Sequence, residues 1–86
     1  MGIEEQHRWL EGENALERSW TFTSFEGAWE FVNTVAELAQ EEGHHPNIHW
    51  DFQRVTLRLT THDLGNTITK KDYRLAALID AITDPS

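Results

Sequence analysis

The sequence predicts an α+β domain in which an antiparallel sheet of the four-stranded type carries two helices packed on one face. Apolar and polar residues alternate over 15–23 and over 48–59, a period that indicates half-buried strands. Apolar residues recur at steps of three and four over 25–39 and again over 75–82, as they do in amphipathic helices. Strands and helices that each have one apolar side are expected to bury those sides against one another in two layers.

The first part of the chain is expected to form a hairpin. Residues 1–8 are polar and are predicted to be frayed. Residues 9–14 predict a short strand that runs into a turn, because Gly12 and Asn14 accept positive φ angles. The alternating segment 15–23 would pair with this strand, although Arg18 interrupts its apolar series.

A long helix, Phe25–Glu42, is predicted next. Ser24 is a suitable N-cap, and Gly43 is suited to end the helix in a left-handed conformation. Pro46 prevents the helix from continuing. The pair of histidines that precedes Pro46 therefore lies at a corner between a helix and a strand.

Residues 48–61 are predicted to form one long strand that leaves this corner. The apolar series moves from even to odd positions after Trp50 and Phe52, which indicates a bulge or a bend near 53–54. Two strands joined by a tight turn are the less favoured alternative, because no Gly, Asn or Asp stands at that point.

The last part of the chain predicts a loop and a second helix. Residues 63–66 are turn formers. Thr69 and Asp72 have the spacing of a capping box, with Asp in place of the usual Glu. The apolar positions that follow predict a helix over 70–82, which Pro85 would end.

Length and composition limit the class of protein. The 86 residues are expected to form a single domain, 1–86, without disulfides, because the chain contains no cysteine. No apolar stretch approaches the roughly 20 residues that cross a bilayer, and no signal-peptide segment follows Met1, so a cytoplasmic protein without membrane contact is expected. The net charge of -8 argues against direct binding of nucleic acid.

Three of the five histidines stand at the two ends of the long predicted strand: His44 and His45 before it, and His62 at its end. Imidazole exchanges protons near neutral pH, so these three residues are candidates for general acid–base catalysis. Asp72, at the start of the second helix, is the fourth candidate. We expect the three imidazoles to converge on one cleft, with Asp72 at its edge.

Other kinds of chemistry are less favoured. A metal site would combine these histidines with His49 and a carboxylate such as Asp63, but their spacing matches no zinc motif. Nucleophilic catalysis is disfavoured, because the chain has no cysteine and no serine in a motif. No glycine-rich phosphate loop is present.

The candidate residues resemble the motif of the pterin-4a-carbinolamine dehydratase family, whose members include a dimerisation cofactor of a homeodomain transcription factor. The resemblance covers about 9–82, because residues 16–22 are similar to that family's second strand, 25–36 to its long helix and 75–76 to its last helix. The chain departs from the family at Gln40, where members commonly carry an ionisable residue. The motif residues, with the family's spacing, are His44, His45, Pro46, Phe52, His62 and Asp72.

The resemblance implies a dehydratase that eliminates water from 4a-hydroxytetrahydropterin to give the quinonoid dihydropterin, in tetrahydrobiopterin recycling, without cofactor or metal. By position, His44 and His62 would be the acid–base pair, and His45 would bind or orient the pterin. Asp72 would support the site. Which histidine is the acid stays open at this point.

Two other functions are kept as alternatives. One is a non-catalytic binding or dimerisation module or transcriptional coactivator, since relatives of the family act in this way and small domains bind partner helices. The other is a role in different pterin or molybdopterin metabolism. Trp50 and Phe52 are interpreted as core residues of a strand in preference to stacking partners of a pterin.

Self-association is also expected. The domain is small, and a long end strand over 48–61 would present unpaired backbone groups that a second copy could cover. The sequence therefore predicts a homodimer or a homotetramer.

Overall fold

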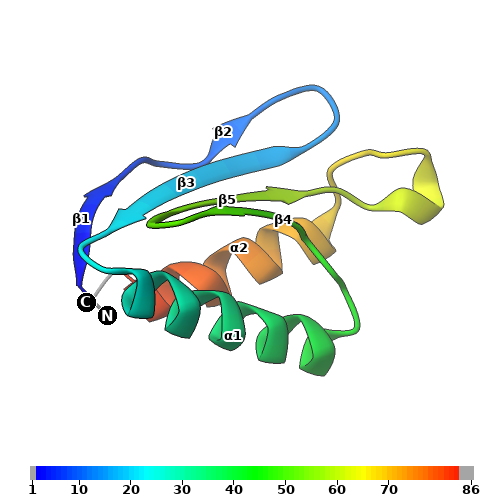
Figure 1. Cartoon of the computed structure of the whole chain (residues 1–86). Coiled ribbons are helices and arrows are strands. Elements are labelled where there is room, and N and C mark those ends of the chain that lie inside the picture. Colours follow the sequence, from blue (N-terminus) through cyan, green and yellow to red (C-terminus); the bar gives the residue numbers. More distant parts are fainter. Residues whose placement is uncertain (1, 84–86) are drawn as a thin grey trace.

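Both helices pack against the same face of one antiparallel sheet, which confirms the predicted fold class (Figure 1). The computed structural model describes residues 2–83. The four main strands lie in the order β1-β3-β5-β4, and the short β2 pairs with β3 along the same edge as β1. The elements are β1 (Ile3–Gln6), β2 (Leu10–Glu11), β3 (Leu16–Phe22), α1 (Phe25–Glu42), β4 (Asn47–Asp51), β5 (Arg54–Leu59), the 3₁₀ turn η1 (His62–Leu64) and α2 (Lys70–Thr83).

The strand β1 corrects the prediction of a frayed start for residues 3–6, while residue 1 lies outside the described residues. β1 pairs with β3, with Ile3 opposite Phe22 and Gln6 opposite Trp20. Only Ile3 of this strand is partly buried, so the segment has no alternating pattern, and backbone pairing along β3 holds it instead. The predicted first hairpin is confirmed by β2, which pairs with the beginning of β3.

The predicted single strand over 48–61 is wrong, because the chain forms two strands joined by a tight turn. Asp51 pairs with Arg54, which leaves a two-residue loop between them. Phe52 in this loop has a φ of 53°, a left-handed conformation that is costly for residues other than Gly, Asn and Asp. Its carbonyl accepts a hydrogen bond from Nε1 of Trp50 at 2.8 Å, and its ring lies 6.1 Å from that of Phe25.

This hairpin also explains why the apolar series changes parity. Ile48 pairs with Leu57 and Trp50 pairs with Val55. Residues that are directly opposite on paired strands share one face of a sheet. Even positions in β4 and odd positions in β5 therefore point to the same side, toward the helices.

The predicted ends of α1 are confirmed. Oγ of Ser24 accepts a hydrogen bond from the Gly27 amide at 3.1 Å. Gly43 ends the helix with a φ of 64°, and its amide donates to the carbonyl of Ala39. The chain then turns directly into the segment that carries the two adjacent histidines.

The predicted capping box of α2 is present as well. The Thr69 amide donates to Oδ2 of Asp72 at 2.9 Å, and the Lys71 amide donates to Oγ1 of Thr69 at 3.3 Å. The helix extends to Thr83, and Pro85 lies outside the described residues.

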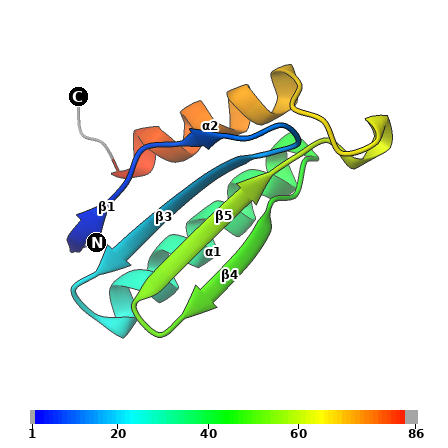
Figure 2. The same ribbon diagram turned by 90° about the horizontal axis from the view of Figure 1, so that it is seen from above.

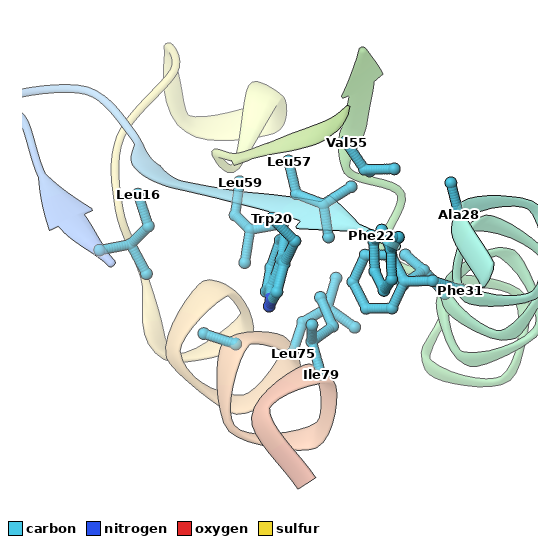
Figure 3. Close-up of a cluster of buried hydrophobic side chains, with 12 residues drawn as sticks. Leu16, Trp20, Phe22, Ala28, Phe31, Val55, Leu57, Leu59, Leu75 and Ile79 are labelled. Carbon is cyan, nitrogen blue, oxygen red and sulfur yellow. The ribbon is translucent and has the colours of Figure 1, made fainter. Parts of the chain in front are cut away.

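The core fills the space between the sheet and the two helices (Figure 3). Aromatic rings form its centre, with Trp20 4.7 Å and Phe22 5.1 Å from Phe31. Arg18, which interrupts the apolar series of β3, is nevertheless buried on the same side of this strand. Its guanidinium pairs with Asp80 of α2 and lies 4.7 Å from the Trp20 ring. The remaining core side chains are Leu16, Ala28, Val35, Val55, Leu57, Leu59, Leu75, Ala76 and Ile79.

The topology gathers three segments at one end of the domain (Figures 1 and 2). The C-terminal end of α1, the loop after β5 and the N-terminal end of α2 all lie there. Nε of Arg74 in α2 donates to Oε1 of Glu42 in α1 at 2.5 Å, which ties these two helix ends together. Among residues 2–83, no helix is long and apolar enough to cross a membrane.

Candidate active site

The three predicted histidines line one hollow at this end of the domain. The hollow has a volume of about 180 Å³, and its walls are Gly43, His44, His45, Thr61, His62, Asp63 and Lys71. His44 and His45 come from the corner after α1, which turns both adjacent side chains toward one space. In a regular strand, neighbouring side chains would point to opposite faces. His62 comes from a different segment, at the start of η1.

Asp72 lies behind His44. Nε2 of His44 donates a hydrogen bond to Oδ1 of Asp72 at 2.6 Å. The Asp72 side chain is completely buried, so it does not lie at the open edge of the cleft as the sequence led us to expect. Asp72 reaches the hollow indirectly, through two of the residues that line it, His44 and Thr61.

The other oxygen of Asp72 is held by the start of α2 and the end of β5. Oδ2 accepts from the Thr61 hydroxyl at 2.8 Å and from the Thr69 amide at 2.9 Å. Burial opposes the charge of this carboxyl and acts to raise its pKa. The hydrogen bonds from His44, Thr69 and Thr61 outweigh burial, and the pKa lies below its ordinary value of 3.8. Asp72 is therefore ionised at neutral pH and can only accept hydrogen bonds, which requires a proton on Nε2 of His44.

The other two imidazoles have neutral partners. Nε2 of His45 donates to Oε1 of Gln40, near the C-terminal end of α1, at 3.2 Å. Nδ1 of His62 donates to Oδ1 of Asn66 at 2.7 Å. Gln40, which departs from the family's ionisable residue, thus acts as a hydrogen-bond acceptor for the second histidine of the pair.

Each histidine therefore has one ring nitrogen fixed by an oxygen acceptor. The second nitrogen is Nδ1 in His44 and His45, and Nε2 in His62. In a neutral imidazole, the nitrogen without the proton carries the lone pair and can accept one. Of these three histidines, His44 is the one whose hydrogen-bond partner is a carboxylate, and a carboxylate favours a positive charge on the ring. The arrangement suits proton transfer between a charged imidazole on one wall and a neutral imidazole on the other.

Other candidates from the sequence lie in different places. Asp63 lines the hollow, whereas His49 lies exposed on β4. Within residues 2–83 there is no group of three or more His, Asp or Glu side chains arranged to hold a metal ion. Trp50 stacks on Phe25 with ring centres 5.1 Å apart. Trp50 and Phe52 belong to the β4–β5 hairpin, and neither residue lines the hollow.

Sequence patterns alone missed several residues around the hollow. Lys71 and Thr61 line it, and Asn66 and Gln40 hold its histidines. In the sequence, Asn66 stood out only as one of the turn-forming residues 63–66. Gln40 stood out only because it replaces the ionisable residue that the family commonly carries there. A neighbouring hollow of about 440 Å³ shares Thr61, Asp63 and Lys71 with the first and adds Leu64, Thr69 and Lys70. The two hollows together fall within the size range of ordinary ligand sites, about 300–1,000 Å³.

A larger hollow, of about 550 Å³, lies elsewhere, beside Trp9 and Asp80. Its polar groups bond to one another: Nε1 of Trp9 and the Arg18 guanidinium both donate to Oδ1 of Asp80. Arg18 also donates to Oε1 of Gln6 at 3.0 Å. These hydrogen bonds hold β1, β3 and α2 together, so we interpret this hollow as structural. The histidine hollow is the better candidate for an active site.

Comparisons with known proteins agree with this geometry. A family model described as pterin 4 alpha carbinolamine dehydratase matches residues 2–82. A protein from Gloeobacter violaceus is 48% identical over 69 residues, which cover 80% of this chain and 74% of that protein. One from Koribacter versatilis is 42% identical over 76 residues, which cover 88% and 80%. Both are provisionally named pterin-4-alpha-carbinolamine dehydratases.

Solved structures with the same fold carry related titles. A transcriptional coactivator/pterin dehydratase from Brucella melitensis is similar with a TM-score of 0.77 and 30% identity, over 93% of this chain and 83% of that one. A pterin dehydratase-like protein, identified as a RuBisCO assembly factor in the alpha-carboxysome, has a TM-score of 0.72 and 26% identity, over 96% and 95% of the two chains.

Proposed function

Because this chain belongs to the pterin-4a-carbinolamine dehydratase family, we propose that it eliminates water from a 4a-hydroxytetrahydropterin to give the quinonoid dihydropterin. The observation that carries the proposal is the hollow in which His44, His45 and His62 meet. Such an elimination is promoted by giving a proton to the leaving hydroxyl and taking one from the ring nitrogen, so three imidazoles with fixed ring nitrogens supply suitable chemistry. No metal or cofactor takes part in the proposed reaction.

The bond changes assign two roles. The C4a–O bond breaks, and the departing hydroxyl takes up a proton and leaves as water. The ring nitrogen next to C4a loses its proton, and its electron pair forms the C=N double bond. One group must therefore give a proton and another must take one, so the reaction as a whole releases only water.

The partners of the histidines favour one assignment of these roles. Asp72 stabilises a positively charged His44, so His44 is the proposed acid that protonates the leaving hydroxyl. His62 has a neutral partner and a lone pair on Nε2, so it is the proposed base. His45 is proposed to bind the pterin edge, and the rest of the substrate would extend over the neighbouring hollow beside Lys71. Asp72 acts through His44 as a positioning residue.

Replacing His62 with Ala tests the proposal. We expect dehydration of a 4a-carbinolamine, followed by stopped-flow absorbance, to slow by about 100-fold or more. Far-UV circular dichroism and the melting temperature should change little, because His62 is exposed. His49→Ala is the matched control and should keep full activity. An active His62→Ala protein would show that the catalytic assignment is wrong.

We further propose that the protein forms a homodimer or a homotetramer. The edge strand is β4, only five residues long, so the fourteen-residue strand on which the expectation rested does not exist. Instead, β4 has one free edge, and exposed aromatic side chains lie beside it. Phe25, Trp29 and Phe52 are each about half exposed or more. Apolar side chains next to an unpaired strand favour association with a second copy.

The same surface favours a binding module as the second candidate function. The two solved neighbours are titled a coactivator/pterin dehydratase and an assembly factor, so proteins of this fold have been connected with macromolecular partners. A purified protein without dehydratase activity, together with capture of a partner that Trp29→Ala abolishes, would favour this second candidate.

A further inference from the structure

We propose that Asn66 is the positioning residue for His62: its side-chain carbonyl fixes the proton of the imidazole on Nδ1 and leaves Nε2 as the nitrogen that accepts the substrate proton. The contact is the 2.7 Å hydrogen bond from Nδ1 of His62 to Oδ1 of Asn66. The inference rests on the proposed dehydratase function, and it adds a residue outside the histidine and aspartate motif.

The loop between β5 and α2 is built to bring Asn66 back to His62. The amide of Thr61 donates to the carbonyl of Thr67 at 2.9 Å, so the loop is closed at its base. Inside the loop, Gly65 and Asn66 have φ angles of 76° and 58°. Two consecutive left-handed residues reverse the chain sharply, which returns the Asn66 side chain to the imidazole four residues earlier.

The backbone conformation alone does not account for an asparagine. Glycine adopts a left-handed conformation more readily than any other residue, and it already occupies the preceding position. Asparagine is one of the few other residues that tolerate this conformation, and it adds a side-chain acceptor. That acceptor is used on His62, so the position combines turn geometry with control of the imidazole.

Asn66 differs from the partner of His44 in charge. A neutral carbonyl fixes the tautomer without stabilising imidazolium as strongly as a carboxylate does. The partner of His44 is thus a carboxylate and the partner of His62 a neutral carbonyl, which fits the proposed roles of acid and base. The other ionisable groups around His62 are Asp63 on its own loop, His44 and His45 across the hollow and Lys71 on α2, and none of them is altered by a change at Asn66.

Two substitutions at this position separate turn geometry from the hydrogen bond. Asn66→Gly suits the left-handed backbone and removes only the acceptor. Asn66→Asp keeps the shape and the acceptor but adds a negative charge. Both variants should fold, with melting temperatures within about 3 °C of the wild type, since the residue is exposed.

The main measurement is ¹⁵N NMR of the histidine ring nitrogens, which distinguishes protonated from unprotonated Nδ1 and Nε2 without any substrate. In the wild type at high pH, we expect His62 to carry its proton on Nδ1. In Asn66→Gly, the two tautomers should mix, and kcat should fall in proportion to the fraction that presents the wrong nitrogen, about twofold for an equal mixture, with KM unchanged. In Asn66→Asp, the titration midpoint of His62 should rise by about 1 pH unit.

The pH profile supplies the second measurement. A base must be unprotonated to act. A higher titration midpoint for His62 in Asn66→Asp should therefore shift the acidic limb of the kcat/KM profile to higher pH by the same amount. A His62 tautomer that is unchanged in Asn66→Gly, or a kcat that stays at the wild-type value after the tautomers have mixed, would overturn the role of Asn66. Absence of dehydratase activity in the wild type would refute the proposed function instead, and the NMR arm would still decide whether Asn66 controls the imidazole.

Discussion

The substitution Asp72→Asn tests the link between the fold and the site most directly. The carboxylate is fully buried and accepts three short hydrogen bonds, from His44, the Thr61 hydroxyl and the Thr69 amide, besides a longer one from the Thr69 hydroxyl at 3.5 Å. Asparagine has nearly the same shape, but one of its two terminal groups is a donor. If its carbonyl keeps the bonds to Thr61 and Thr69, its NH₂ group faces Nε2 of His44, which must then give up its proton.

The expected loss of stability follows from these three bonds. A hydrogen bond to a charged group contributes about 1.5–3 kcal/mol and one between neutral groups about 0.5–1.5 kcal/mol. Each bond should therefore weaken by about 1 kcal/mol, a total of about 3 kcal/mol for the three. A chain of 86 residues has a total stability of about 4–13 kcal/mol, so the variant should still fold. Its melting temperature should fall by about 12–24 °C.

The expected loss of activity follows from the tautomer. With its proton moved to Nδ1, His44 is a neutral imidazole that has lost its carboxylate partner, and a neutral imidazole is a far weaker acid than an imidazolium, so dehydration should slow by about 100-fold. The control is Asp80→Asn at the other end of α2, which weakens the ion pair with Arg18 and the hydrogen bond from Trp9. This control should lower stability but leave the ¹⁵N shifts of His44 and the turnover rate unchanged. An Asp72→Asn protein that melts like the wild type and keeps its rate would refute the reasoning.

Two further predictions concern pH and self-association. Because the pKa of Asp72 is lowered on folding, its carboxylate contributes its full stabilisation above its ordinary value of 3.8 and loses it as pH falls through the folded-state pKa. Urea unfolding should therefore show that the gap between wild type and Asp72→Asn narrows below that pH; a constant gap would contradict the assignment. Ile48→Lys on the free edge of β4 should shift sedimentation at tens of micromolar toward the 10.0 kDa monomer, whereas Leu64→Lys, also at an exposed apolar position, should not. A wild type that sediments as a monomer would exclude the proposed association.

The helices were predictable because their signals are local. Ser24, Gly43 and the Thr69–Asp72 capping box fix helix ends through hydrogen bonds within a few residues, and the structure contains each of them. The β4–β5 hairpin was missed because its turn does not use the residues that normally allow one. Phe52 adopts a left-handed conformation that contacts with Trp50 and Phe25 support, and such contacts between distant segments are not visible in the local sequence.

Of the candidate site, the histidines were predictable from the sequence, whereas the residues that hold them were not. The spacing of the histidines and the corner at Pro46 led to the expectation that they converge, and all three line one hollow; their catalytic roles stay a prediction. Their partners were not predictable in the same way. Burial of Asp72 depends on how α2 packs behind His44, and the bond from His62 to Asn66 depends on two left-handed residues in a loop that the sequence described only as rich in turn formers.

Asp72 and Asn66, the partners of His44 and His62, differ in how much they contribute to the stability of the fold. Asp72 caps α2 with one oxygen and holds His44 with the other, so a change that alters the proposed acid also destabilises the helix. Asn66 holds the proposed base from an exposed loop, and its side chain contributes little to the core. Substitutions on the His62 side should therefore change the proton affinity of the site at almost constant stability. Substitutions on the His44 side should change activity and stability together, and this contrast is what a paired set of Asp72 and Asn66 variants would measure.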